Sequence, residues 1–457
     1  MNMITSHEIS LAKHCITYAT ACGASAARVS LSKSVTDAYT VLNGELDKVS
    51  HSADRSIYLY LFVDGRYGTF STNRLEQDDL EEFVSKAIDM VRMLGEDECR
   101  RLPDRERTAG DAVTGRELGL FDERYFSIES DERLANAFKL SKYASIKANE
   151  SGYRLISEEC EYTQTADDNY LTDSNGFEGR HSETTFGAFS EMTVEAPDGC
   201  KYSGYWWLTT SEADGIDFDE CSTKALERAL RQVGAKKRRS GRYRMIVDNT
   251  VSSRLVAPLI TALNASSLQQ KMSFLEDSIG QKVFSEGMSL MDLARTPGKN
   301  GSRLFDTEGV ATKDAPVIEN GVVKQYFVNT YNAGKMGISP TTEDISRPCL
   351  MPYLKGRHLQ EEEKEVSLKD ILKLAGNGIL VTGFNGGNCN PVTGDFSFGI
   401  EGFAFSKGRI THPVREMLIT GNIIDLWNNL LAAGGDARPS SRWQIPTLAF
   451  EGVAFSA

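Results

Sequence analysis

The sequence predicts an α+β protein of two domains, with largely antiparallel sheets and flanking helices. Helical and strand-like patterns both recur along the chain, but they do not alternate regularly as βαβ units do. The length of 457 residues is more than one ordinary core uses, since domains typically have about 100 to 200 residues. A basic run at 236–239 separates a predicted helix from a predicted strand, and we place the boundary there. The expected domains are therefore 1–240 and 241–457.

The first domain opens with a predicted helix. Thr5 and Glu8 have the spacing of a capping box, in which each side chain satisfies a backbone N–H of the first turn. Gly23 is suited to end this helix, because glycine readily adopts the left-handed conformation after a last turn. The further elements expected in this domain are two strands joined at Asp64-Gly65 within 56–70, helices at 77–94, 131–149 and 223–233, and two long strands within 186–211 around Pro197-Asp198-Gly199.

The second domain begins with a predicted strand at 243–248, followed by a predicted buried helix within 251–271. Its apolar residues have the three- and four-residue spacing of one helical face: Leu255, Val256, Leu259, Ile260 and Leu263. From Asn249 to Leu275 there is no His, Cys, Asp or Glu. This helix can therefore supply no general acid or base, no thiolate and no metal ligand.

A six-residue pattern occurs twice near the end of the chain. Residues 401–406, EGFAFS, return as EGVAFS at 451–456. Bulky and small residues alternate in both copies, and this alternation favours two β-strands that use the same packing arrangement. A weak internal duplication and a coincidence are the other two explanations.

Composition excludes several classes of function. The net charge of -13 repels phosphate backbones, so we expect no direct binding of nucleic acid. The eight cysteines show no C-x-x-C pair, and we expect reduced thiols. No apolar run has the length of a signal peptide or a membrane span. The expected protein is cytoplasmic, without a membrane partner.

No strong local motif for catalysis is present: the chain contains no H-E-x-x-H, Walker A, dinucleotide-binding or nucleophile-elbow sequence. The glycine-rich stretch 383–413 brings together Cys389, Asp395 and His412. These are the residue types of a Cys-His-Asp nucleophile system, which would make the chain a self-sufficient hydrolase built on Cys389. The alternative is a turn-rich pair of strands in which Asp395 accepts hydrogen bonds from backbone amides.

Several segments together resemble the PmbA/TldD family, once called modulators of DNA gyrase and understood as zinc-dependent peptidases. The resemblance covers nearly the whole chain. Its clearest segments are 271–280 (KMSFLEDSIG), 305–310 (FDTEGV), 318–324 (IENGVVK), 391–397 (PVTGDFS) with Gly399, 412–414 (HPV) and 419–422 (ITGN). Each segment alone is weak, but the set is specific.

The resemblance also implies where a metal site would lie. Family members of the TldD type carry H-E-x-x-x-H on the helix after the domain boundary, with a third ligand, a cysteine, close to the C-terminus. Counted back from Lys271, the three motif positions fall on Ala257, Pro258 and Ala262, which cannot bind a metal or transfer a proton. No cysteine follows Cys389, and the corresponding tail is 434–438, GGDAR.

The chain therefore resembles the PmbA or TldE type of subunit, which lacks the zinc motif. The resemblance implies no catalytic residue, metal or cofactor on this chain, zinc on a TldD-type partner, a heterodimer or possibly a homodimer, and unfolded peptide substrates bound as added β-strands. The candidate groove residues are Asn388, Cys389, Asn390, Thr393 and Asp395. The chain departs from the TldE pattern at Thr341-Thr342 and at 388–390. A regulator that binds gyrase or another protein without proteolysis is the competing hypothesis.

Overall fold

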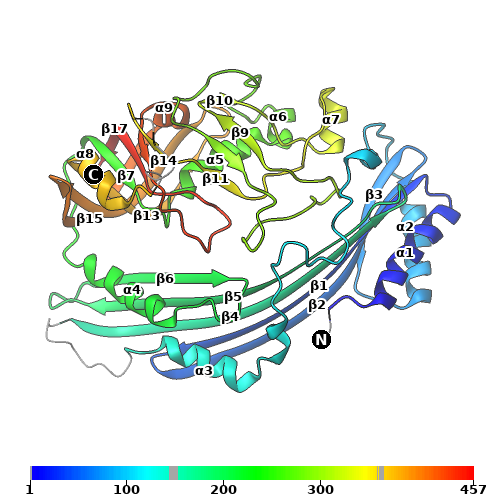
Figure 1. The fold of residues 1–457 in the computed structure, drawn as a ribbon, viewed down its shortest axis with the longest axis horizontal. Coiled ribbons are helices and arrows are strands. Elements are labelled where there is room, and N and C mark those ends of the chain that lie inside the picture. The colour runs from blue at the N-terminus through cyan, green and yellow to red at the C-terminus, as the bar shows by residue number, and fades with distance from the viewer. Residues whose placement is uncertain (1–2, 144–152, 358, 360–364) are drawn as a thin grey trace. The chain divides into compact units, whose positions relative to one another are not determined.

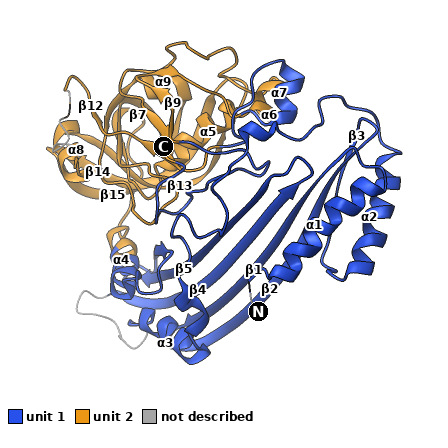
Figure 2. Ribbon diagram, turned by 45° about the vertical axis from the view of Figure 1, so that its right-hand side comes forward, with its two compact units in different colours: residues 1–227, 294–313, 328–344 blue, residues 228–293, 314–327, 345–457 orange. Residues whose placement is uncertain are grey.

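The computed structural model describes residues 3–143, 153–357, 359 and 365–457. The chain divides into two compact units, which Figure 2 shows in different colours. Unit 1 comprises 1–227, 294–313 and 328–344, and unit 2 comprises 228–293, 314–327 and 345–457. The first boundary between the units lies at Glu227, and the later segments 294–313 and 328–344 also belong to unit 1. The domain boundary at residue 240 that the sequence indicates stays a prediction.

Unit 1 is built on one long antiparallel sheet (Figure 1). Its strands lie in the order β3-β2-β1-β4-β5-β6. Their bounds are β1 Ala26–Leu42, β2 Glu45–Val63, β3 Arg66–Thr72, β4 Arg154–Asp173, β5 Glu178–Glu195 and β6 Lys201–Thr210. Along β1 and β4 buried and half-buried residues alternate, because successive side chains of a strand point to opposite faces.

Three of the helices predicted in unit 1 begin within one residue of the predicted start, but the helix predicted at 223–233 begins at Phe218, and the short helix at Thr330 was not predicted. The helices of unit 1 are α1 Ser6–Ala21, α2 Gln77–Val91, α3 Ser130–Leu140, α4 Phe218–Arg231, which contains the unit division, and α7 Thr330–Met336. The capping box of Thr5 and Glu8 is confirmed, and Gly23 follows α1 with φ +102. Helices α1 and α2 pack with the sheet around an apolar core that contains Leu11, Leu31 and Val84.

Two local predictions for unit 1 differ in outcome. The hairpin between β2 and β3 is confirmed: Asp64 and Gly65 have φ 51 and 73, the positive values that a tight hairpin turn requires. The helix predicted to reach Asn149 is wrong in its length, because α3 ends at Leu140. The cap residue Ser141 already has a non-helical ψ of 84, and 144–149 lie outside the described residues.

Unit 2 contains a seven-stranded sheet in the order β12-β16-β17-β15-β14-β13-β7, with a further pairing between β17 and β7. That pairing closes β7, β13, β14, β15 and β17 into a ring. The strands are β7 Gly241–Val247, β12 Tyr353–Leu354, β13 Gly378–Cys389, β14 Asp395–Ser406, β15 Arg409–Asn422, β16 Leu430–Ala433 and β17 Leu448–Ser456. All neighbours are antiparallel except β7 and β13. The predicted fold class, α+β with largely antiparallel sheets, is confirmed.

A second, four-stranded sheet and short helices complete unit 2. The sheet has the order β10-β9-β8-β11, and the remaining bounds are β8 Leu290–Asp292, β9 Ala315–Glu319, β10 Val322–Val323, β11 Pro348–Leu350, α5 Ser253–Leu263, α6 Ala265–Gln269, α8 Leu368–Ala375 and α9 Ile423–Asn428. The stretch predicted as one helix over 251–271 is therefore two helices. Asn264 interrupts it with an extended ψ of 134, and its side chain caps α6 by accepting from Ser266 N.

The repeated six-residue pattern lies on two strands of the same closed ring. Residues 401–406 belong to β14 and 451–456 to β17. The prediction that both copies form strands is confirmed. No helix in the described part of the chain is both long and apolar enough to cross a membrane.

Candidate functional site

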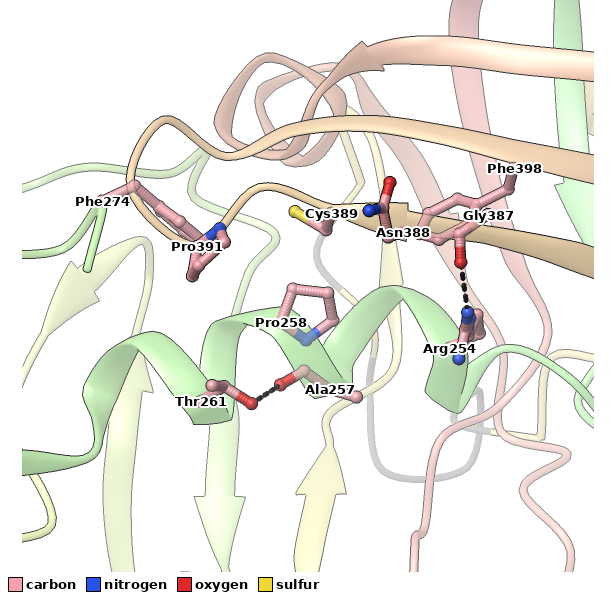
Figure 3. Close-up of a pocket in the computed structure, with 10 residues that line it drawn as sticks. All are labelled: Arg254, Ala257, Pro258, Thr261, Phe274, Gly387, Asn388, Cys389, Pro391 and Phe398. Carbon is pink, nitrogen blue, oxygen red and sulfur yellow. Dashed lines mark hydrogen bonds between the residues drawn. The ribbon is translucent and has the colours of Figure 1, made fainter. Parts of the chain in front are cut away.

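A pocket of about 280 Å³ lies in unit 2 between α5 and the end of β13 (Figure 3). Four residues of α5 form one wall: Arg254, Ala257, Pro258 and Thr261. Their spacing of three and four places them on one face of the helix. The other wall comes from the end of β13 and its surroundings: Phe274, Gly387, Asn388, Cys389, Pro391 and Phe398.

The opposite face of α5 fixes the helix in the core of unit 2. Leu255, Val256 and Leu259 are fully buried, as their apolar spacing predicts. Trp427, which is also fully buried, donates its indole N–H to the carbonyl of Leu255 at 3.2 Å. The pocket wall is therefore the partly exposed side of a firmly packed helix.

The three positions that correspond to a zinc motif occupy both sides of this helix. Ala257 and Pro258 line the pocket, whereas Ala262 is 1% exposed, and its carbonyl accepts a hydrogen bond from Ser273 Oγ at 2.6 Å. A methyl group and a pyrrolidine ring face the pocket where a metal ligand and a general base would stand. Neither group can coordinate an ion or accept a proton.

The strand wall of the pocket is distorted by a bulge. The pairing of β13 with β14 shifts between Phe384 and Gly387, and Gly386 and Gly387 have φ +76 and +90. A Cβ on Gly387 would lie 2.0 Å from the carbonyl oxygen of Ser397, so only glycine fits there. Arg254 stabilises the bulge by donating from Nη2 to the carbonyl of Gly387 at 2.9 Å.

After its pairing with β7 ends, β13 has an open edge that includes the bulge. Its parallel pairing with β7 covers only Gly378 to Val381. Among the residues that the structure describes, no further strand pairs with this side of 383–389. Residues 385–388 are exposed. This edge runs beside the pocket and offers backbone N–H and C=O groups to an extended chain.

Two of the five predicted groove residues line the pocket, and three form the turn that follows it. Asn388 and Cys389 are part of the wall. In the turn, Asn390 N donates to the carbonyl of Asp395 at 2.7 Å, and Thr393 Oγ1 donates to Asp395 Oδ2 at 2.8 Å. Hydrogen bonds from Asn422 and Thr393 hold the pKa of Asp395 below its usual value. Asp395 thus organises the turn beside the pocket.

The geometry does not assemble a Cys-His-Asp system. Asp395 pairs with Asn422 across β14 and β15, whereas His412 pairs with Ala404 at the far part of the ladder. The ten residue steps along β15 from His412 to Asn422 span about 33 Å at 3.3 Å per step. Burial, with the charge of Asp395, raises the pKa of the Cys389 thiol, which disfavours the thiolate that such a mechanism needs. The hypothesis of a self-sufficient hydrolase on Cys389 is wrong for this fold.

The tail segment 434–438, which corresponds to the position of the missing third zinc ligand, is held by its own contacts. Asp436 accepts hydrogen bonds from Thr447 N at 2.8 Å and from Thr447 Oγ1 at 2.7 Å. Its carbonyl accepts from Asn249 Nδ2 at 2.6 Å, just before α5. The described residues contain no group of three or more His, Cys, Asp or Glu arranged to hold a metal ion.

Sequence analysis missed six of the ten residues that line the pocket: Arg254, Thr261, Phe274, Gly387, Pro391 and Phe398. Arg254 and Thr261 were detectable in principle, because they occupy the polar side of an amphipathic helix at the spacing of Ala257 and Pro258. Phe274 and Phe398 come from distant parts of the chain. Only the folded unit brings them to one place.

The comparisons with known proteins agree with this architecture. Three family models match in sequence order: the PmbA/TldA metallopeptidase domain 1 over residues 27–91, the central domain over 125–233 and the C-terminal domain over 240–457. Together these matches cover most of the chain. The fold is therefore that of a metallopeptidase family, and the chain is a member of the PmbA/TldD family.

Curated relatives and solved structures support the family at full length. The chain is 25% identical over 437 residues to metalloprotease PmbA of Escherichia coli O157:H7, covering 92% of this chain and 89% of that protein. It is 24% identical over 410 residues to a PmbA homologue of Buchnera aphidicola subsp. Acyrthosiphon pisum, covering 89% and 88%. A crystal structure from Bacteroides thetaiotaomicron, named as a modulator of DNA gyrase, has 38% identity, a TM-score of 0.92 and full coverage of both chains. TldE from Thermococcus kodakarensis, at 16% identity and TM-score 0.81, shares the fold over 98% of this chain and all of its own.

Proposed function

We propose that this chain is the non-catalytic, peptide-binding subunit of a zinc-dependent metallopeptidase, of the PmbA or TldE type. The observation that carries the proposal is the pocket wall on α5. The helix, the bulged strand and the cavity are all present, but Ala257 and Pro258 face the cavity where a ligand and a base would act. The pocket of this chain thus has the form of a peptidase site but lacks the groups that activate water.

The residues of this chain do not fit a zinc ion. A catalytic zinc takes three protein ligands from His, Cys or carboxylate groups. The described lining of the pocket offers Cys389 alone among these types, and the raised pKa of that thiol opposes deprotonation. We therefore assign zinc to a TldD-type partner subunit and no step of the chemistry to a metal on this chain.

The proposed substrate is an unfolded peptide. An extended chain can add to the open edge of β13 at 383–389, where the backbone groups of the strand hydrogen-bond to it irrespective of its sequence. The pocket would then receive one side chain, and its walls favour an apolar one, because Pro258, Phe274 and Phe398 line it. A folded protein has few unpaired backbone groups to offer, so this mode selects for unstructured segments. We propose that this takes place in the cytoplasm.

Hydrolysis of an unstructured peptide tests the proposal. The purified chain alone, a TldD-type protein alone and their mixture are compared by mass spectrometry, each with and without a metal chelator. We expect cleavage that requires both chains and is abolished by the chelator, and no stoichiometric zinc on this chain by elemental analysis. Chelator-sensitive cleavage by this chain alone would overturn the proposal. Peptide binding by the mixture without any cleavage would favour the regulator hypothesis instead.

A matched pair of variants tests the pocket itself. Thr261 is exposed on the pocket face of α5, and Gln269 is exposed on α6 away from the pocket lining. Thr261→Trp should fill the cavity and weaken binding of a fluorescent peptide about tenfold, as expected when roughly one anchoring side chain is excluded. Gln269→Trp adds the same bulk and should leave binding unchanged. If the two variants change peptide binding equally, the peptide does not bind in this pocket.

A further inference from the structure

The outer edge of β2 in unit 1 is open over much of its length. Strand β3 pairs only with Ile57–Val63 of β2, and β1 occupies the other side of β2 throughout. In the described part of the chain, no strand pairs with the outer edge over 48–56. Residues 45–55 are exposed except for Ser50, which is half-buried. A long exposed edge of this kind is a template for another strand.

This edge is regular from Lys48 onwards. The ladder with β1 runs without interruption from Lys48 opposite Thr40 to Phe62 opposite Ala26. A shift in that ladder leaves Asp47 outside the regular pairing, as in a β-bulge. The open and regular segment is therefore 48–56, long enough for several hydrogen bonds with a second strand.

The charges on this segment are not used inside the chain. Lys48, Asp54 and Arg55 form no ion pair with any described residue, and Asp54 accepts only a hydrogen bond from Ser52 Oγ at 2.6 Å. Edge charges commonly serve to repel other strands. Here the order of the charges along the strand makes them attract, not repel, when two copies of this strand pair with each other.

We propose that the 48–54 edge of β2 pairs with the same edge of a second copy of this chain, antiparallel and centred on His51. In a two-fold antiparallel pair of identical strands, two opposite residues must both direct their backbone groups across the interface or both direct them away from it, so they lie an even number of positions apart. Centred on His51, Lys48 lies opposite Asp54 of the second copy. By symmetry Asp54 lies opposite Lys48, so two oppositely charged pairs form.

The neighbouring registers lack this match. Centred on Ser50, Lys48 meets Ser52 and Asp54 meets Leu46. Centred on Ser52, Lys48 meets Ser56 and Asp54 meets Ser50. Only the register centred on His51 gives opposite charges within the regular segment, and it also opposes Val49 to Ala53 and Ser50 to Ser52. Oppositely charged residues directly across a ladder stabilise the pair, whereas like charges destabilise it.

The net charge of -13 per copy does not prevent this contact at ordinary salt. At 0.15 M ionic strength the screening length is about 8 Å, whereas opposed side chains of a ladder start about 5 Å apart. The distant charges of the two copies are therefore screened more than the facing pairs. The interface is a single strand edge, smaller than a standard protein interface, so we expect a weak dimer with a Kd of roughly 10 to 100 µM.

Charge exchange across the proposed register gives the test. Lys48→Asp places Asp opposite Asp54, and Asp54→Lys places Lys opposite Lys48. Each variant alone should weaken dimerisation of the full chain at least about tenfold, measured by sedimentation equilibrium from about 1 to 200 µM. An equimolar mixture of the two variants should recover dimerisation as mixed dimers, because every facing pair is again opposite. The double variant in one chain should recover it too.

Asp78→Lys is the control. Asp78 is exposed in the first turn of α2, and its substitution changes the net charge as Asp54→Lys does. It should leave the dimer unchanged, and circular dichroism checks that each variant is folded. A chain that stays monomeric throughout, a dimer that the single variants leave intact, or a mixture that recovers nothing would each overturn the proposal. The readout is mass, so its outcome does not depend on the proposed peptidase role.

Discussion

The six-stranded sheet of unit 1 is open, whereas the sheet of unit 2 closes on itself through β17 and β7. The open sheet leaves the 48–56 edge of β2 exposed, and the closed ring has an unpaired edge at the end of β13, beside the pocket. Closure removes most edges, so an open edge that borders a pocket is a suitable place for an extended ligand. An open sheet keeps longer edges, which suit contact with another chain.

The two sheets also differ in what their strands bury. Charged residues are buried on β1 and β4: Arg28, Lys33, Asp37, Glu158, Asp168 and Asp173. On β13 to β17 no charged residue is buried. The open sheet therefore depends on paired buried charges, and the closed ring depends on close apolar and backbone packing. The four predictions below test this difference.

Closure should make the ring intolerant of added atoms. A Cβ on Gly402 of β14 would lie 1.9 Å from the backbone carbonyl oxygen of Leu380, whereas a Cβ on Gly187 of β5 would meet the side-chain oxygen of Thr163 at 2.5 Å. A side chain can rotate away, but the backbone of a closed ring cannot. Gly402→Ala should lower the free energy of unfolding by about 3 kcal/mol or more, and Gly187→Ala by about 1 kcal/mol. Urea unfolding measures both, and equal losses would contradict the comparison.

Removing a buried carboxylate should damage the open sheet next most. Asp168 is fully buried and accepts from Ile4 N at 2.9 Å, Arg180 Nε at 2.9 Å and Ser182 Oγ at 2.8 Å. Asp168→Ala leaves these donors without their acceptor and should cost about 3 kcal/mol in urea unfolding. Glu82→Ala is the control, because Glu82 and Lys86 are both 66% exposed, and ion pairs on the surface contribute little to stability. If Asp168→Ala lowers the free energy of unfolding by less than about 1 kcal/mol, the open sheet does not depend on its buried charges.

Acid should weaken a smaller anchor of the open sheet. Hydrogen bonds from Arg124 lower the pKa of Asp122 to about 2, and Asp122 N donates to Thr184 Oγ1 on β5 at 2.9 Å. A carboxyl whose pKa is depressed by folding stabilises the protein above its unfolded pKa of about 3.9, and this contribution is lost as the pH falls towards 2. After allowance for the half-exposed Arg124, Asp122→Asn should cost about 1 kcal/mol at pH 7.

The same substitution should cost clearly less at pH 2.5, because the carboxyl is then largely protonated in the unfolded chain, and most of the stability that its low folded-state pKa provides has been lost. Urea unfolding at the two pH values measures the difference. Asp78→Asn, at an exposed position, serves as the control and should cost little at either pH. A cost for Asp122→Asn that is the same at both pH values would show that the charge of Asp122 is not what stabilises this loop.

The smallest effect is expected at the thiol beside the pocket. Cys389 is half-buried and packs at the margin of the apolar core of unit 2. Cys389→Ala should change the free energy of unfolding by less than about 1 kcal/mol. Because its pKa is raised, the thiol should also react slowly with iodoacetamide at pH 7, as followed by mass spectrometry. Rapid alkylation at this position would indicate a polarised thiol and reopen a chemical role for it.

Local sequence determined the elements whose causes are local. The capping box of Thr5 and Glu8, the turn at Asp64-Gly65 and the buried face of α5 were all predictable, because each depends on residues within one or two turns of chain. The break of the predicted helix at Asn264 was not. There the extended conformation brings Ala265 N to the carbonyl of Phe327 at 2.8 Å, a partner about sixty positions away in the sequence.

The repeated hexapeptide separates what the sequence determines from what only the tertiary structure determines. Its alternation determined two strands, and the absence of His, Cys, Asp and Glu on 249–275 determined that α5 holds no catalytic group. Yet Gly402 is required because Leu380 lies against it, whereas Gly452 has φ +64 and nothing within 4 Å of an added Cβ. The sequence shows the same residue in both copies. Strand pairing in the folded unit decides which glycine is packed and which strand edge stays open, and tertiary packing decides which distant side chains meet α5 at the pocket, because these depend on contacts between segments that lie apart in the chain.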